Sequence, residues 1–204
     1  MRLFKTMSGL VVAGLIGLVT ACGGESGFIP AGNSANLNGP VSLTLQGAFI
    51  DSAVEGVQYT YGSLVSKTDA KGKFLYNTGS SVKFTIGDIL IGEALGAPVI
   101  TPVDFVISAD DETDSVVTNI ARFLQTLDND ANPENGITIT KEVFDLGKNK
   151  SIDFNQSISK FSEDGNVQIV VAEMTAATEA GARLLVDASV AQAHLKATLA
   201  TLAP

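Results

Sequence analysis

The sequence predicts an α+β fold, with a small antiparallel β-sandwich over residues 41–105 and an α-helical part over residues 106–204. Apolar and polar residues alternate with a period of two through much of the first segment, which is typical of half-buried strands. In the second segment apolar residues recur every three or four positions, which indicates amphipathic helices. The 204 residues are 45% apolar and 17% charged, a composition that allows a buried core.

Four strands are predicted from the alternation. The first alternates Val41, Leu43 and Leu45 with polar residues, and the second places Val57, Tyr59 and Tyr61 on one face. In the third, Phe74 and Tyr76 point to one side, and in the fourth, Val82, Phe84 and Ile86 point inward. Asp51 and Ser52 predict a turn after the first strand. Before the third strand, Asp69 is expected to cap a turn through its side chain, and Gly72 to take the positive φ that closes it.

Three short patterns in this segment occur together in one known family. They are Gly47 with Asp51, Gly56 with Val57, and the stretch Thr68 to Phe74. Together they resemble the carboxypeptidase-regulatory-like, or transthyretin-like, β-sandwich. The resemblance implies a non-catalytic module that acts as a spacer, a stiffener or an appendage. Residues 86–92 depart from the pattern because they continue as a further hairpin, so we expect an open sandwich covered by the chain that follows.

A first helix is predicted over residues 113–128. Four acidic residues precede its apolar positions. Negative side chains at the start of a helix interact favourably with the positive end of the helix dipole. The alternative for these acids is a metal site. Asn119 falls between core positions, and we expect it to form hydrogen bonds with a neighbouring loop.

The remaining helical pattern is less regular. Scattered apolar residues between 143 and 161 predict short helices and turns. Asn166 is expected to cap a helix that ends near Gly181, and Asp187 to cap a last helix. One continuous helix over residues 167–202 is the alternative.

Residues 1–21 have the order of a secretory signal peptide: basic residues, a short apolar run and small residues. The run is shorter than a membrane-spanning helix requires. Val19, two small residues and Cys22 then resemble a bacterial lipobox. The resemblance implies cleavage before Cys22, a diacylglycerol on its sulfur and an acylated amino terminus. A plain secretory signal, in which the cysteine has no role, is the alternative.

Residues 22–40 predict a flexible tether, since they hold five of the 20 glycines and two prolines. Gly23 follows the cysteine where an Asp marks retention at the inner membrane, so the lipobox resemblance implies the cell outer membrane. The net charge of −9 argues against nucleic-acid binding, which needs a basic surface. An acidic surface is also repelled by anionic lipids, so the anchor would be the acyl chains.

One loop has oxygen side chains at the spacing of a calcium loop. Asp128, Asp130 and Asn132 occupy its positions 1, 3 and 5. Pro133 stands where glycine permits the sharp turn, and Ile139 stands where an acidic residue closes the site. Calcium is the one cofactor that we consider, and a metal-free loop rich in Asp and Asn is the alternative.

No catalytic motif is found. His194 is the only histidine, and its neighbours Asp187 and Ser189 share its predicted helix, so only a distant serine could complete a triad. We expect His194 to contact a neighbouring loop or water. The absence of tryptophan disfavours a sugar-stacking cleft, and there is no phosphate loop or dinucleotide fingerprint.

The sequence therefore predicts a lipid-anchored envelope protein that binds or scaffolds without catalysis. Its expected partner is an envelope protein or a polysaccharide. The alternative is an envelope hydrolase with a carboxylate site between the β and helical parts. Such an enzyme would need buried or cleft-facing carboxylates with raised pKa values.

Overall fold

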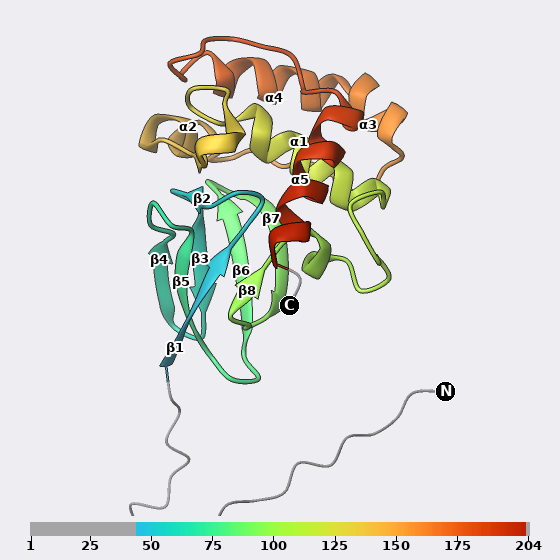
Figure 1. Ribbon diagram of the computed structural model, residues 1–204. Helices are drawn as coiled ribbons and strands as arrows, with labels where there is room; N and C mark the ends of the chain where they lie inside the picture. The colour runs from blue at the N-terminus through green and yellow to red at the C-terminus, as the bar shows by residue number, and fades with distance from the viewer. Residues whose placement is uncertain (1–43, 203–204) are drawn as a thin grey trace, which may run out of the picture. The chain divides into compact units, whose positions relative to one another are not determined.

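The computed structural model describes residues 44–202, which form an α+β fold with strands in the first half and helices in the second (Figure 1). One sheet has four antiparallel strands in the order β4-β3-β6-β7, and another has three strands in the order β5-β1-β8. Their bounds are β1 Thr44–Phe49, β3 Gln58–Tyr61, β4 Leu64–Lys67, β5 Lys73–Asn77, β6 Ser81–Ile86, β7 Ile89–Leu95 and β8 Val99–Ile100. The expected antiparallel β architecture is therefore present, although β1 and β8 pair in parallel.

The two sheets face each other across an aromatic core. Phe49 and Phe74 come from the three-stranded sheet, and Phe84 comes from the four-stranded sheet. The ring of Phe84 lies 4.9 Å from that of Phe49 and 5.2 Å from that of Phe74, measured between centroids. All three rings are buried. Contacts of this kind, added to the burial of large apolar surfaces, hold the sheets together.

The turn predictions before β5 are confirmed. Asp69 accepts hydrogen bonds from the amides of Lys71 and Lys73, each at 2.9 Å, and Gly72 has a φ of +68°. Leu45, which alternates with polar residues in the predicted first strand, is 38% exposed, and the buried part of β1 is Gly47–Phe49. Only this end of β1 pairs on both sides, with β5 and with β8.

The second half holds five α-helices, two short 3-10 helices and one strand. Their bounds are η1 Pro102–Phe105, α1 Ser115–Thr126, η2 Pro133–Asn135, β9 Ile137–Thr138, α2 Lys141–Leu146, α3 Ile158–Glu163, α4 Gly165–Thr175 and α5 Ala188–Leu202. β9 was not predicted, and it pairs in parallel with β2, Val54–Glu55. This pairing joins the two halves of the sequence.

α1 lies at the centre of the helical half, and it corresponds to the helix predicted over residues 113–128, although it begins two residues later. The Asp114 carboxylate caps it by accepting from the amides of Val116 at 2.8 Å and Val117 at 3.2 Å. Asn119 is fully buried and donates to the carbonyls of Phe154 at 3.1 Å and Gln156 at 2.9 Å. The predicted contact between Asn119 and a loop is therefore confirmed.

The helix after α3 differs from the prediction. Asp164 caps α4, because its carboxylate accepts from the amides of Asn166 and Val167, while the Asn166 side chain donates to Ser151 O. α4 ends at Thr175 rather than near Gly181. The break before α5 is as predicted, and the single helix over residues 167–202 is wrong.

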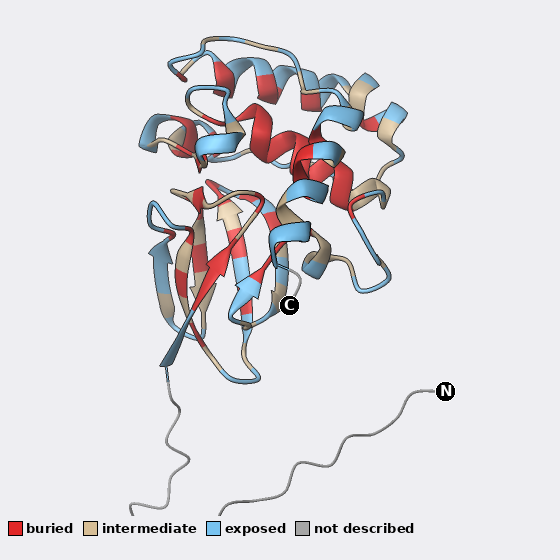
Figure 2. Ribbon diagram, viewed as in Figure 1, coloured by how far each residue is buried: buried red, intermediate tan, exposed pale blue. Residues whose placement is uncertain are grey.

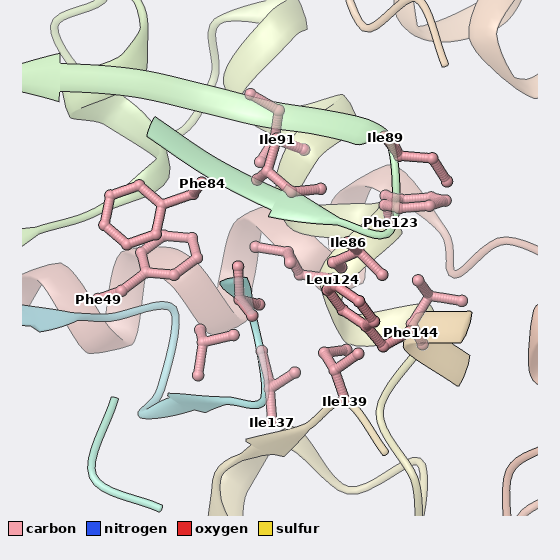
Figure 3. Close-up of a cluster of buried hydrophobic side chains, with 14 of the residues drawn as sticks. Phe49, Phe84, Ile86, Ile89, Ile91, Phe123, Leu124, Ile137, Ile139 and Phe144 are labelled. Carbon is pink, nitrogen blue, oxygen red and sulfur yellow. The ribbon is translucent and has the colours of Figure 1, made fainter. Parts of the chain in front are cut away.

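The helical half packs over one end of the sandwich, and one buried cluster runs through both (Figures 2 and 3). Phe84, Ile86 and Ile89 belong to this cluster together with Phe123 and Leu124 of α1. Every described contact lies within residues 44–202, so a chain that begins at residue 23 contains all of them.

The predicted signal peptide, the tether, Cys22, Val41 and Leu43 lie outside the described residues. Between residues 44 and 202, none of the helices has the length and apolar character that crossing a membrane requires.

Candidate functional site

One candidate site is a cavity of about 680 Å³ beside α5. Its walls come from the end of α1, the loop that leads into η2, the segment 183–186 and the first turns of α5. The lining residues are Gln125, Thr126, Ala131, Pro133, Glu134, Arg183, Leu184, Val186, Ser189, Val190, Ala193, His194 and Ala197. This volume lies within the range of small-molecule sites, about 300–1,000 Å³.

Apolar side chains form most of the cavity wall. Leu184 is 86% exposed and Val190 is 53% exposed, and both line the cavity. Leu184 lies in the segment between α4 and α5, and Val190 lies in the first turn of α5. Large apolar side chains that line a cavity and remain exposed to solvent are typical of binding surfaces.

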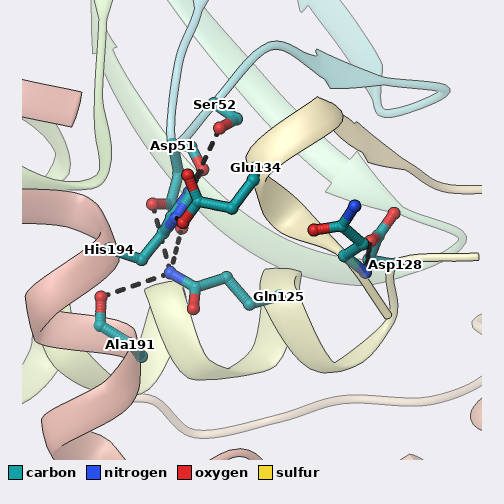
Figure 4. A network of polar contacts seen from close by, with 8 residues as sticks. Asp51, Ser52, Gln125, Asp128, Glu134, Ala191 and His194 are labelled. Carbon is teal, nitrogen blue, oxygen red and sulfur yellow. Dashed lines mark hydrogen bonds and ion pairs between the residues drawn. The ribbon is translucent and has the colours of Figure 1, made fainter. Parts of the chain in front are cut away.

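A polar cluster adjoins the cavity and joins the β half to α5 (Figure 4). His194 Nε2 lies 3.0 Å from the carbonyl oxygen of Asp51 and 3.1 Å from Ser52 Oγ. His194 Nδ1 lies 3.0 Å from Glu134 Oε1. The predicted contact between His194 and a loop is therefore confirmed. The histidine side chain is 7% exposed and that of Glu134 is 79% exposed.

Ser52, His194 and Glu134 are connected by hydrogen bonds in the arrangement serine, histidine, carboxylate of a catalytic triad. Ser52 also has a φ of +54°. The hydrogen-bond chemistry nevertheless opposes this role. A carbonyl oxygen only accepts, so the contact with Asp51 O requires a hydrogen on Nε2. A general base would need a lone pair on Nε2 to take the serine proton. In this arrangement His194 therefore acts as a donor to the 51–52 turn.

Asp51 places a carboxyl group inside the protein next to this cluster. Its side chain is completely buried, and burial raises the pKa of the carboxyl well above its usual range. The hydrogen bonds from Gln125 Nε2, 3.2 and 3.1 Å from the two carboxylate oxygens, act in the opposite direction and lower the pKa. The fold therefore favours the protonated form of Asp51.

The raised pKa of Asp51 predicts a stability difference that depends on pH. Its stabilising contribution is complete below the pKa of an unfolded Asp, about 3.9, and is lost as the pH rises through the higher pKa of the folded state. Asn cannot ionise, so Asp51→Asn should gain stability relative to the unchanged protein as the pH rises from 4 to 7. Urea unfolding of both proteins measures this difference in the free energy of unfolding, because the contributions of the other carboxylates are the same in both and cancel. A difference that stays constant with pH would contradict a raised pKa.

Arg183 forms part of the cavity wall and fixes its shape. Its Nε donates to Thr126 O at 2.9 Å and its Nη1 to Thr178 Oγ1 at 2.9 Å, while Nη2 donates to Asp128 O. These bonds hold the segment before α5 against the end of α1. Burial is the main cause that lowers the pKa of the guanidinium, although the Asp128 and Asp130 carboxylates oppose it.

The structure places the predicted calcium residues in one loop, where the carboxylate oxygens of Asp128 and Asp130 each accept a hydrogen bond from the protein. Asp128 accepts from the amides of Asn132 at 2.8 Å and Thr138 at 2.9 Å, and Asp130 accepts from Asn132 N at 3.0 Å and Asn135 Nδ2 at 2.8 Å. Burial raises the pKa of Asp128, whereas the hydrogen bond from Asn135 is the main cause that lowers that of Asp130. Among residues 44–202, no three His, Cys, Asp or Glu side chains come together as a metal-binding group.

Sequence reasoning did not identify Gln125, Glu134 and Arg183 as cavity residues, nor Ser52 as a partner of His194. These residues meet from separate turns, helices and segments, 142 positions apart for Ser52 and His194. The one available signal was a lone histidine, which carried no information about its partners.

Comparisons with protein-family models, with curated proteins and with solved structures found no match to this chain.

Proposed function

We propose that this chain is a lipid-anchored protein of the cell envelope, and that it binds an apolar group of its ligand in the cavity beside α5. The observation that carries the proposal is the cavity itself, with about 680 Å³ of space and mainly apolar walls. Exposed Leu184 and Val190 would lose water contact when the cavity fills. Apolar walls favour an apolar group of an envelope partner over a polysaccharide, whose surface is polar.

The anchor and the location of the protein rest on its first residues. The lipobox-like order around Cys22 supports acylation, and Gly23 supports the outer membrane as the destination. Two or more acyl chains give stable attachment, because each buried methylene contributes about 0.8 kcal/mol. The described fold begins at Thr44, so about 20 residues would separate the anchor from the binding body.

We also propose that residues 44–100 are a variant of the transthyretin-like sandwich. Two facing sheets and the turn with Asp69 and Gly72 support this assignment. In this interpretation β2 and the helical half cover the end that an independent sandwich would leave to solvent. The module would then support the cavity without contributing catalysis.

Binding of an apolar probe tests the proposed function. Prodan, an uncharged naphthalene dye without N–H groups, should fluoresce more strongly and at shorter wavelength with residues 23–204 than in buffer. Ala193→Trp places a large side chain at an exposed position of the cavity wall, and we expect it to reduce dye affinity at least tenfold. Fluorescence titration gives both dissociation constants.

Ala200→Trp is the matched control. Ala200 is also exposed on α5, but it does not line the cavity. This variant should bind Prodan as the unchanged protein does. Equal loss of affinity in both variants, or no binding by the unchanged protein, would contradict the proposal.

Calcium at Asp128, Asp130 and Asn132 is proposed as a stabiliser of the loop that carries the cavity residues Ala131 and Glu134. A bound ion stabilises the folded state by mass action, by about 2.7 kcal/mol at 100 times its dissociation constant. Millimolar calcium should then raise the melting temperature, and chelator should reverse the rise. An Asp130→Asn variant should lose the effect. The same melting temperature with calcium and with chelator would contradict calcium binding at this loop.

A hydrolase with a carboxylate site is the second candidate. The raised pKa values of Asp51 and Asp128 favour it. Against it, neither residue lines the cavity, and Asp128 already accepts hydrogen bonds from two amides. Binding therefore accounts for more of the geometry.

A further inference from the structure

A second cavity, of about 350 Å³, lies between α1, α3, α4 and the segment that leads into α5. Its polar lining residues include Arg122, Ser162, Gln168 and Asp187, and its apolar ones include Val171 and Leu185. We call it the Arg122 cavity. It shares the wall residues Arg183 and Leu184 with the cavity beside α5, so the two cavities lie on either side of this short segment.

Arg122 contributes a guanidinium group to the wall of this cavity, although the residue is only 4% exposed. Its Nε donates to Val186 O at 2.7 Å, and its Nη1 donates to Ser162 Oγ at 2.9 Å. Nη1 also lies 3.5 Å from Ile158 O. Nη2 carries two further N–H groups, and neither has an acceptor among residues 44–202.

Arg122 Nη2 remains accessible to a ligand. The side-chain atoms that are both fully buried and without a partner in the described chain are Asn119 Oδ1 and Gln125 Oε1. Nη2 has no partner and is not one of these atoms, so part of its surface is open. Since Arg122 lines the cavity, a molecule there can reach this nitrogen.

The positive charge of Arg122 has no close counterion. No carboxylate of residues 44–202 lies within ion-pair distance of its guanidinium. Burial is the main cause that lowers the pKa of Arg122, and the more distant Asp187 carboxylate opposes it. Arg183 differs, because all three of its guanidinium nitrogens donate to protein oxygens. Buried charges are normally paired, so a negative group beside Arg122 would be stabilised.

We propose that the Arg122 cavity binds a small monocarboxylate, whose carboxylate group accepts hydrogen bonds from Arg122 Nη2. Its short aliphatic part would lie against Val171 and Leu185. A guanidinium forms stronger hydrogen bonds with an ionised acceptor than with a neutral one. One negative charge matches the one guanidinium that lacks a counterion, whereas a second would add repulsion from Asp187 in the wall. This inference does not rest on the proposed function, because it concerns a different cavity.

Three probes with the same branched carbon skeleton test the inference without altering the protein. Isovalerate carries the carboxylate, isovaleramide is its neutral counterpart, and isopentylammonium carries a positive charge. We expect isovalerate to bind residues 23–204 about ten times more tightly than isovaleramide at neutral pH, in line with hydrogen bonds to a charged group. Isopentylammonium should bind most weakly. NMR titration gives the three dissociation constants, with amide shifts at Gln168, Val171 and Leu185.

Two substitutions in α4 locate the binding. Gln168 is exposed and lines the Arg122 cavity, so Gln168→Trp should reduce isovalerate affinity at least tenfold by filling its space. Ile169→Trp is the matched control, because Ile169 is the next residue, is 60% exposed and does not line the cavity. This variant should bind isovalerate as the unchanged protein does.

Asp187→Asn tests the charge without changing the size of the side chain. Asp187 lines the cavity and directly precedes α5, a position where Asn is also favourable. Removal of its negative charge should tighten isovalerate binding about threefold and leave isovaleramide binding unchanged.

Equal or tighter binding of isovaleramide, tightest binding by isopentylammonium, or no binding by any probe would overturn the inference. Equal loss of isovalerate affinity in Gln168→Trp and Ile169→Trp, or unchanged affinity in Asp187→Asn, would also overturn it. Ala193→Trp, in the cavity beside α5, should leave isovalerate affinity unchanged. Loss of affinity in that variant would place the carboxylate in the other cavity and contradict the inference. Prodan binding tests the proposed function separately, whichever result isovalerate gives.

Discussion

Cys22→Ser is expected to prevent the proposed acylation and, with it, the proposed attachment of the protein to the outer membrane. The thioether forms on sulfur, and this chain has one cysteine, so no other residue can replace it. Loss of two or more acyl chains removes most of the binding free energy for the bilayer, at about 0.8 kcal/mol for each methylene. Incorporation of labelled fatty acid and fractionation of the envelope measure the effect.

Ser26→Ala, in the same predicted tether, is the control and should leave both acylation and fractionation unchanged. Outer-membrane fractionation of Cys22→Ser at the level of the unchanged protein would refute the lipid anchor. Acylation that persists in this variant would do so as well.

Gly87→Ala is expected to cost about 2–4 kcal/mol of the free energy of unfolding. Gly87 lies in the β6–β7 turn with a φ of +59°, and a Cβ there would lie 2.3 Å from the backbone carbon of Gly147 at the end of α2. The cost combines left-handed strain of about 1–2 kcal/mol with displacement of packed backbone. The Asp88 amide donates to Gly147 O at 3.0 Å across the same contact, which would also weaken. Urea unfolding measures the loss.

Gly62→Ala separates these two causes. Gly62 has a similar φ of +53°, but, apart from Gly62 and its two chain neighbours, no atom of the described chain lies within 4 Å of the position that a Cβ would take there. It should therefore lose only the strain, about 1–2 kcal/mol. Equal destabilisation of the two variants would show that the β6–β7 turn does not pack closely against α2.

Local signals in the sequence predicted the parts of the fold that neighbouring residues determine. Asp69 and Gly72 form a turn within five residues, and Asp114 caps the helix that follows it. Alternation also identified the strands around Phe74 and Phe84, and the stop and start signals Gly181 and Asp187 indicated the break between α4 and α5. Each of these features depends on residues that are close in the sequence.

Features that depend on residues distant in the sequence were either not predicted or predicted wrongly. The alternation around Leu45 did not indicate which end of β1 is buried, because Leu45 has a neighbouring strand on one side only. Asn166 is a good capping residue, yet Asp164 is two positions earlier and binds the free amides first. β9 has two residues, too few for a periodic signal, and only pairing with β2 defines it.

The cavity was beyond sequence reasoning for the same reason. His194 was identified because it is the only histidine, but its contacts come from Asp51, Ser52 and Glu134. Gln125 has no unusual sequence context, and its Nε2 donates to both carboxylate oxygens of Asp51, 74 positions away. Such a property exists only in the folded protein.

Mapping of Prodan binding by NMR tests the central claim most directly. In ¹H–¹⁵N spectra of residues 23–204, the dye should shift the amide signals of residues around the cavity, among them Ala131, Leu184 and Val190. Signals of the distant β4 residues Val65 and Ser66 should stay in place. Shifts confined to the β-sandwich, or a spectrum that the dye leaves unchanged, would contradict the claim that the cavity beside α5 is a binding site.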